Sequence, residues 1–174
     1  MRTFRIITFG CKVNQYDSQQ WRAALLRAGL SEAADDGDCD VALVNTCTVT
    51  VAADSQARQA MRKCRTQNAN CKIVVAGCYG QVGAVALRKL PEADLVVGRY
   101  GPDSFGAVRT ALGSAEAPFA EGIGGFAGHT RAFLKVQDGC GHRCSYCIVP
   151  LARGPSRSRK LAELIAEAGR LAAA

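Results

Sequence analysis

The alternation of β-branched strands with amphipathic helices is the feature that most restricts the fold of this chain. Short apolar runs that are typical of strands are each followed by a segment with helical spacing of its apolar residues. The predicted strands are Arg5–Phe9, Val41–Asn45, Lys72–Ala76 and Asp94–Val97, and the predicted helices are Ser18–Ala28, Ala53–Gln67, Gly83–Leu90 and Pro102–Leu112. This order predicts an α/β fold with a doubly wound parallel sheet.

Two of these segments carry clear local signals. The helix Ser18–Ala28 is expected to begin after Asp17 as its N-cap and to bury a face formed by Trp21, Ala24, Leu25 and Ala28. The run Val41–Asn45 is apolar enough for a strand that is buried on both faces.

Three cysteines follow the ends of three predicted strands. Cys11, Cys47 and Cys78 each come one or two residues after a strand, although they are far apart in the chain. Ligands of open parallel sheets bind outside the carboxyl ends of the strands, so we expect these thiols to meet at one sheet edge. The alternative is that they are simply three small residues in βα turns.

Three other cysteines have a different position. Cys39 and Cys71 precede strands and are therefore expected near the opposite edge of the sheet. Cys64 lies on the apolar stripe of a predicted helix and is expected to be an ordinary core residue.

The remaining three cysteines form a tight cluster late in the chain. Cys140, Cys144 and Cys147 are separated by three and two residues, with Tyr146 directly before the last. Iron–sulfur clusters are normally held by four thiolates, so three local ones would leave one iron open to a small molecule. A zinc site is an alternative, but it needs a fourth ligand, which His142 inside the cluster is poorly placed to supply. A disulfide with one spare thiol is another.

The chain divides at a segment without periodicity. Residues 114–129 are rich in small residues and are predicted to link a domain at 1–113 to a second one that starts at 130. There a strand at Arg131–Gln137 leads into the cysteine cluster, and an amphipathic helix begins near Ser158.

Composition narrows the cellular setting. The chain has no apolar run long enough for a membrane span, and its start is too short in apolar residues for a signal peptide. We therefore expect a cytoplasmic protein, in which nine cysteines, an odd number, serve as metal ligands or core residues rather than disulfides. The net charge of +7 is compatible with a nucleic acid partner.

Several stretches together resemble the radical S-adenosylmethionine methylthiotransferases. The resemblance is collinear, covers nearly the whole chain, and is closest to the threonylcarbamoyladenosine tRNA branch, with small departures at Val51 and Leu151. The matching stretches are Thr8–Ser18, Val44–Thr50, Ala76–Tyr79, Phe133–Cys140, Tyr146–Pro150 and Ala152–Arg159. The family's other branches modify isopentenyladenosine in tRNA or an aspartate of a ribosomal protein.

The resemblance implies two 4Fe-4S clusters and S-adenosyl-L-methionine. Cys140, Cys144 and Cys147 would hold the cluster that binds and reductively cleaves S-adenosylmethionine, with Tyr146 near its adenine. Cys11, Cys47 and Cys78 would hold the second cluster, which carries the sulfur to be transferred. The implied reaction adds a methylthio group to C2 of N6-threonylcarbamoyladenosine at position 37 of tRNA.

The implied partners are tRNA and an electron donor. Arg153, Arg157, Arg159 and Lys160 are candidates for contacts with tRNA phosphates, or else form a solvated basic turn. The oligomeric state, the reductant and the sulfur donor stay open. A non-catalytic metal module and an RNA-binding module without chemistry are the alternatives from other functional classes.

The length of the second part suggests an incomplete enzyme. Forty-five residues follow Gly128–His129, whereas a complete (β/α) barrel takes about 250 residues. We therefore expect only the first βα unit of a radical S-adenosylmethionine partial barrel, in a chain that is inactive alone. The last helix should then expose an apolar face.

Overall fold

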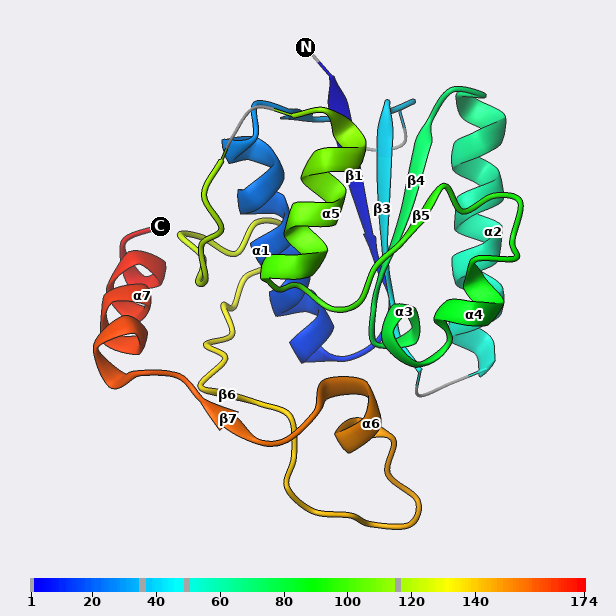
Figure 1. Ribbon diagram of the computed structural model, residues 1–174. Coiled ribbons are helices and arrows are strands. Elements are labelled where there is room, and N and C mark those ends of the chain that lie inside the picture. Colours follow the sequence, from blue (N-terminus) through cyan, green and yellow to red (C-terminus); the bar gives the residue numbers. More distant parts are fainter. Residues whose placement is uncertain (1, 35–36, 49–50, 115–116) are drawn as a thin grey trace.

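The computed structural model describes residues 2–34, 37–48, 51–114 and 117–174, with only the backbone described at 51–54 (Figure 1). Residues 49–50 of the matching stretch Val44–Thr50 and residues 115–116 of the predicted linker lie outside the described residues.

A five-stranded parallel sheet forms the centre of the molecule. Its strands lie in the order β2-β1-β3-β4-β5, and each neighbouring pair is parallel. They are β1 (Thr3–Thr8), β2 (Ser31–Glu32), β3 (Val41–Thr46), β4 (Lys72–Gly77) and β5 (Leu95–Val96). The predicted α/β fold with a parallel sheet is confirmed, whereas the two-residue edge strand β2 was not predicted.

Helices cover both faces of this sheet (Figure 1). On one face, α1 (Lys12–Arg27) and α5 (Pro102–Leu112) bury residues such as Trp21 and Phe105 against Leu43 of β3. On the other face, α2 (Val51–Gln67) and α4 (Ala84–Leu87) pack against Val44. Successive strand residues point to opposite faces, so β3 is buried along its whole length, as its apolar run predicts.

The first helix corrects the sequence prediction. It begins at Lys12, directly after Cys11 as N-cap, and not after Asp17. Asp17 is instead buried within the helix, where its carboxylate accepts hydrogen bonds from Lys135 and Arg153. The predicted inner face is confirmed, since Trp21, Ala24, Leu25 and Ala28 are all buried.

The third predicted helix is also different. The segment after β4 forms two short helices, α3 (Cys78–Val82) and α4, that are separated by Gly83. The ring of Tyr79 lies so close to Gly83 that any side chain there would collide with it. Cys78 is therefore the first residue of a helix rather than part of a loop.

The second part of the chain is mostly irregular. Its regular elements are β6 (Gln137–Asp138), α6 (Val149–Arg153), β7 (Arg157–Ser158) and α7 (Leu161–Ala173), and β6 pairs with β7 in antiparallel fashion. The predicted strand Arg131–Gln137 is wrong over most of its length: residues 132–136 are irregular, and β6 pairs with a strand, β7, of two residues. The last helix starts at Leu161 and not near Ser158, because Ser158 belongs to β7.

The segment between the two parts packs along the first helix. Ile123 and Phe126 form a small buried cluster with Tyr16 of α1, against which Phe133 and Leu171 also lie. The amphipathic helix α7 leaves Leu161 and Ile165 exposed, which confirms the expected apolar face. Among the described residues, none of the helices is both long and apolar enough to span a membrane.

Candidate functional site

The first three candidate cysteines lie at one edge of the sheet. Cys11 caps α1 after β1, Cys47 directly follows β3, and Cys78 starts α3 after β4. A side chain at Gly10 would meet the Cβ and Sγ atoms of Cys47, which shows how closely the first two loops approach each other. Cys47 and Cys78 also interact electrostatically. The structure therefore brings these three segments together at the ends of β1, β3 and β4, as the sheet topology predicts.

Asn14 contacts all three of these cysteine-bearing segments. Its side-chain amide donates hydrogen bonds to the carbonyl oxygens of Phe9 at 2.9 Å and Thr46 at 2.8 Å, in the loops that carry Cys11 and Cys47. Its side-chain oxygen accepts a hydrogen bond from the thiol of Cys78 at 3.7 Å. Asn14 is completely buried, so these partners fix its position and it in turn fixes theirs.

The three thiols differ in their access to solvent. Cys11 is exposed, whereas Cys47 and Cys78 are buried. Burial raises the pKa of Cys78, and the nearby guanidinium of Arg153 opposes that rise without cancelling it. A buried thiol of this kind favours its neutral form until a metal or a stronger positive charge stabilises the thiolate.

The second set of candidate cysteines lies on a solvent-facing loop. Cys144 is exposed, and Cys140 and Cys147 are half-buried. The backbone of Cys140 donates to the carbonyl of Gly154, and that of Cys147 donates to the carbonyl of Cys144. Tyr146 is 90% exposed, so its ring is available to a ligand.

Two helices connect the segments that carry the two cysteine sets. Helix α6 begins two residues after Cys147 and packs against α3, which begins at Cys78. The loop that carries the second set therefore leads into a helix that packs at the sheet edge, and Figure 1 shows the loop itself projecting away from the sheet. The structure places all six cysteines on this side of the molecule.

The four predicted RNA-contacting residues have different environments. Arg153 is 5% exposed, and its guanidinium donates to Asn14, Asp17 and Asp138. Arg159 is half-buried and binds Tyr16 and Glu167. Only Arg157 and Lys160 are exposed.

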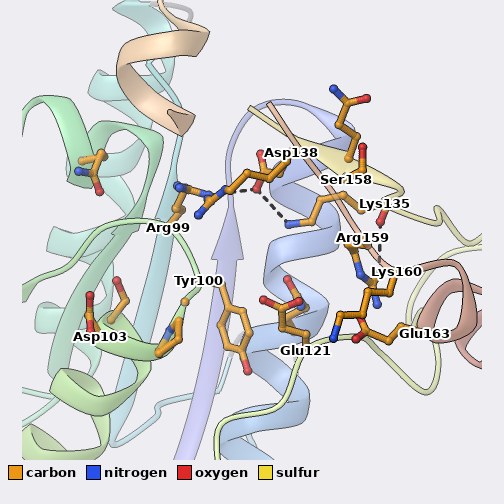
Figure 2. A pocket seen from close by; sticks show the side chains of 17 residues that line it. Arg99, Tyr100, Asp103, Glu121, Lys135, Asp138, Ser158, Arg159, Lys160 and Glu163 are labelled. Atoms are coloured by element: carbon orange, nitrogen blue, oxygen red, sulfur yellow. Dashed lines mark hydrogen bonds and ion pairs between the residues drawn. The ribbon is translucent and has the colours of Figure 1, made fainter. Parts of the chain in front are cut away.

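A cavity of about 490 Å³ lies beside these residues, between the N-terminal end of α5 and the β6–β7 pair (Figure 2). Five cationic side chains line it: Arg99, Lys135, Arg157, Arg159 and Lys160. Figure 2 shows Asp138 between Arg99 and Lys135, with which it forms ion pairs. Burial raises the pKa of Asp138, but the positive charges of Lys135 and Arg153 outweigh burial and hold this pKa below its usual range.

The remaining three cysteines form a separate group. Cys39 and Cys71 lie near the start of β3 and β4, with their Sγ atoms 3.9 Å apart, and Cys64 of α2 is within hydrogen-bonding reach of Cys39. The contact with Cys64 lowers the pKa of Cys39, but the hydrogen bond with Cys71 and burial together raise this pKa to about 11. All three are buried in the core, and their contact with one another was not predicted.

The arrangement of the possible ligands bears on which kind of metal group they could hold. Within the described ranges, no three His, Cys, Asp or Glu side chains are arranged as ligands of one metal ion. A cluster of several irons takes each thiolate on a different iron, so its ligands need not point at a single atom. All nine cysteines are free, as thiol ligands must be.

Sequence reasoning missed the polar residues that support the site. Asn14, Asp17 and Asp138 are part of it, but none was a candidate. A weak signal for Asn14 and Asp17 was present in the sequence. Both lie near the start of a helix whose later turns carry an apolar face, and buried polar residues at such a place are unusual.

Comparisons with known proteins agree with the sequence motifs. Residues 3–98 match the model of the uncharacterized protein family UPF0004. The chain is 38% identical to the threonylcarbamoyladenosine tRNA methylthiotransferase MtaB of Chlamydia pneumoniae, over 95% of this chain and 39% of the relative. It is 36% identical to the MtaB of Rickettsia prowazekii, over 93% of this chain and 38% of that protein.

A relative of another branch also matches. The tRNA-2-methylthio-N(6)-dimethylallyladenosine synthase of Sphingopyxis alaskensis is 36% identical over 99% of this chain and 42% of its own length. The chain thus spans about 40% of the length of these curated relatives. Since the family model covers β1 to β5 and all three strand-end cysteines, the chain belongs to the family UPF0004.

Proposed function

We propose that this chain forms the N-terminal part of a radical S-adenosylmethionine methylthiotransferase that adds a methylthio group to C2 of N6-threonylcarbamoyladenosine in tRNA. The observation that carries the proposal is that α6, which follows the second three-cysteine set, packs against α3, which begins at Cys78 of the first set. The names of the relatives support the reaction and its substrate.

The donor sets suit two 4Fe-4S clusters. Each set supplies three thiols, one fewer than such a cluster needs, and so leaves one iron for another ligand. Cys11, Cys47 and Cys78 would hold one cluster, in a partly buried site that Asn14 organises. Cys140, Cys144 and Cys147 would hold the other, on a loop open enough for a small molecule to reach.

The cofactors supply the chemistry of this reaction, which is radical formation from S-adenosylmethionine and transfer of a methylated sulfur. The residues of the chain hold the cofactors in position. Exposed Tyr146 would contact the adenine of S-adenosylmethionine. The packing of α6 on α3 would hold the two cluster sites at a fixed relative position.

The tRNA contacts are assigned to two of the four basic candidates. Arg157 and Lys160 are exposed and line the cavity beside α5, where they could pair with phosphates. Arg153 and Arg159 are engaged by carboxylates of the chain itself, so their role is internal. Free thiols and a redox reaction also suit a cytoplasmic setting with an electron donor.

Anaerobic reconstitution with iron and sulfide tests the proposal. We expect about eight irons per chain, falling to about four in Cys11→Ala/Cys47→Ala/Cys78→Ala and also in Cys140→Ala/Cys144→Ala/Cys147→Ala. The matched control is Cys39→Ala/Cys64→Ala/Cys71→Ala, which removes the same number of thiols from the opposite edge and should keep all the iron.

Each other outcome would contradict part of this proposal. Bound zinc with little iron would indicate a structural metal module and would rule out the radical mechanism. An affinity for tRNA that survives loss of all six ligands, in a protein that binds no iron, would indicate an RNA-binding module. Iron loss in the control variant would show that the two edges of the sheet had been assigned wrongly.

A further inference from the structure

A buried ion network connects the two cysteine sets. The guanidinium of Arg153 lies 3.0 Å from a carboxylate oxygen of Asp17 and 3.0 Å from one of Asp138. Lys135 binds the same two carboxylates, at 2.6 Å and 3.4 Å, and Arg99 binds Asp138 at 3.2 Å. We call these five residues the Arg153 network.

The Arg153 network holds more positive than negative charge. Three cations share two carboxylates, so one positive charge is in excess. The side chains of Arg153 and Asp17 are 6% and 3% exposed, and the other three are 22% exposed or less. An unbalanced charge in such a place is costly unless an anion is close by.

A candidate for that anion is the thiolate that Cys78 would supply to a bound cluster. The side-chain oxygen of Asn14 accepts one hydrogen bond from Arg153 at 2.8 Å and another from the thiol of Cys78 at 3.7 Å. Arg153 and Cys78 therefore lie on either side of a single oxygen atom, and they interact electrostatically. Cys78 is 6% exposed, so water screens this interaction only weakly.

The network also touches the second cysteine set through the backbone. Asp138 comes two residues before Cys140, and its carboxylate accepts a hydrogen bond from the backbone of Gly139. Arg153 ends α6, which begins two residues after Cys147. The excess charge is thus held in place by residues from both parts of the chain.

We propose that Arg153 is a positioning residue that holds this excess positive charge against Cys78 and thereby raises the reduction potential of the iron–sulfur cluster at Cys11, Cys47 and Cys78. The inference rests on the function proposed above. Reduction adds one electron to the cluster, and a nearby positive charge stabilises the more negative, reduced state. Arg153 is always protonated in proteins, so the charge is permanent.

The test uses the full chain with the substitutions Cys140→Ala/Cys144→Ala/Cys147→Ala, so that only the cluster at the sheet edge remains. Its midpoint potential is measured by anaerobic titration with dithionite, followed by electron paramagnetic resonance. We expect Arg153→Gln to shift the potential to more negative values and Arg153→Lys to retain most of the wild-type value. Arg157→Gln removes the same charge from an exposed position four residues later and should leave the potential unchanged.

A second variant should shift the midpoint potential in the opposite direction. Asp138→Asn removes a negative charge from the network and should shift the potential to more positive values. A merely structural role for these residues predicts disturbance in both variants but no such opposition in sign. Asp138→Asn and Arg153→Lys also provide the test where Arg153→Gln does not fold.

The outcomes separate this inference from the proposed function. If the parent chain for this test binds no four-iron cluster, the proposed function fails together with the inference. If the cluster forms and the potentials of Arg153→Gln and Asp138→Asn equal that of the parent, the proposed function stands and only the role of Arg153 is overturned.

Discussion

The hydroxyl of Tyr16 in α1 donates a 2.7 Å hydrogen bond to the carboxylate of Glu167 in α7, 151 positions later in the chain. Both side chains are almost completely inaccessible to solvent. Arg159 completes the contact, with its guanidinium 2.6 Å from Glu167 and 2.8 Å from the Tyr16 oxygen. This triad fixes the last helix to the first.

Removal of Glu167 should therefore detach the last helix. Glu167→Ala leaves Arg159 without its buried carboxylate partner, a change that costs up to about 3–5 kcal/mol. We expect the amides of α7 to lose protection from hydrogen exchange while those of β3 and β4 keep it.

The matched control is Glu163→Ala, which removes an exposed carboxylate one turn earlier on the same helix. Its exchange pattern should equal that of the unchanged chain. Equal protection of α7 in Glu167→Ala and in the unchanged chain would contradict the proposed attachment.

The same triad predicts a loss of stability at alkaline pH. Burial and the hydrogen bond to Glu167 raise the pKa of Tyr16 above its ordinary value. Because the folded state holds the proton more tightly, its contribution is complete below the unfolded pKa of about 10 and is lost as pH rises above that value. Stability should fall by up to about 1.4 kcal/mol per pH unit there.

Urea unfolding from about one pH unit below to about 1.5 units above the pKa of a free tyrosine measures this loss. Tyr16→Phe should show a shallower decline than the unchanged chain because it has no proton to lose at this position. Tyr146→Phe alters a tyrosine that is 90% exposed and should decline as steeply as the unchanged chain. Parallel curves for all three proteins would refute the prediction.

The parts of the fold that the sequence predicts are those with local apolar patterns. β3 and β4 are continuous apolar runs, and the apolar face around Trp21 repeats at helical spacing, so local residues determine these elements. The convergence of Cys11, Cys47 and Cys78 follows from topology, since the ends of parallel strands share one edge.

The parts that could not be predicted depend on distant partners. Asp17 has the sequence position of an N-cap, and only its bonds to Lys135 and Arg153 explain why it is buried inside α1. Those partners lie 118 and 136 positions away, beyond any local pattern. Arg153 resembles a surface RNA contact for the same reason, because its charge is visible in the sequence and its carboxylate partners are not.

Loss of the Asn14 side chain should loosen the loops that carry Cys11 and Cys47. Asn14→Ala leaves the carbonyl oxygens of Phe9 and Thr46 without this donor, and a buried group left unpaired costs about 1–3 kcal/mol. We expect lower stability in urea unfolding and less iron bound after reconstitution.

Two further variants test whether the loss of iron in Asn14→Ala comes from the lost hydrogen bonds to the two carbonyl oxygens. Gln15→Ala changes the next residue of the same helix, which is half-buried, and should keep its iron. Asn14→Asp keeps the oxygen that accepts from Arg153 but cannot donate to the two carbonyls, so it should resemble Asn14→Ala. An iron content equal to that of the unchanged chain in both Asn14 variants would exclude this role.

Gly77 sets the direction in which Cys78 leaves the sheet. Its φ of +98° lies in the region that glycine favours, and a Cβ atom there would lie 2.4 Å from both the side-chain oxygen of Asn45 and the carbonyl oxygen of Thr46. Gly77→Ala should therefore cost about 1–2 kcal/mol for the backbone conformation and about 1–3 kcal/mol more for the collision.

Comparison with Gly29→Ala separates the backbone cost from the cost of the collision. It has a similar φ of +83°, but a Cβ atom there would meet nothing within 4 Å. Gly29→Ala should thus show only the backbone cost in urea unfolding and should bind as much iron as the unchanged chain. Gly77→Ala should be less stable than Gly29→Ala and should bind less iron, because the carbonyl that it displaces belongs to the residue before Cys47. Equal stability and equal iron in the two variants would mean that the close approach of β3 and β4 at this edge does not constrain the cysteines.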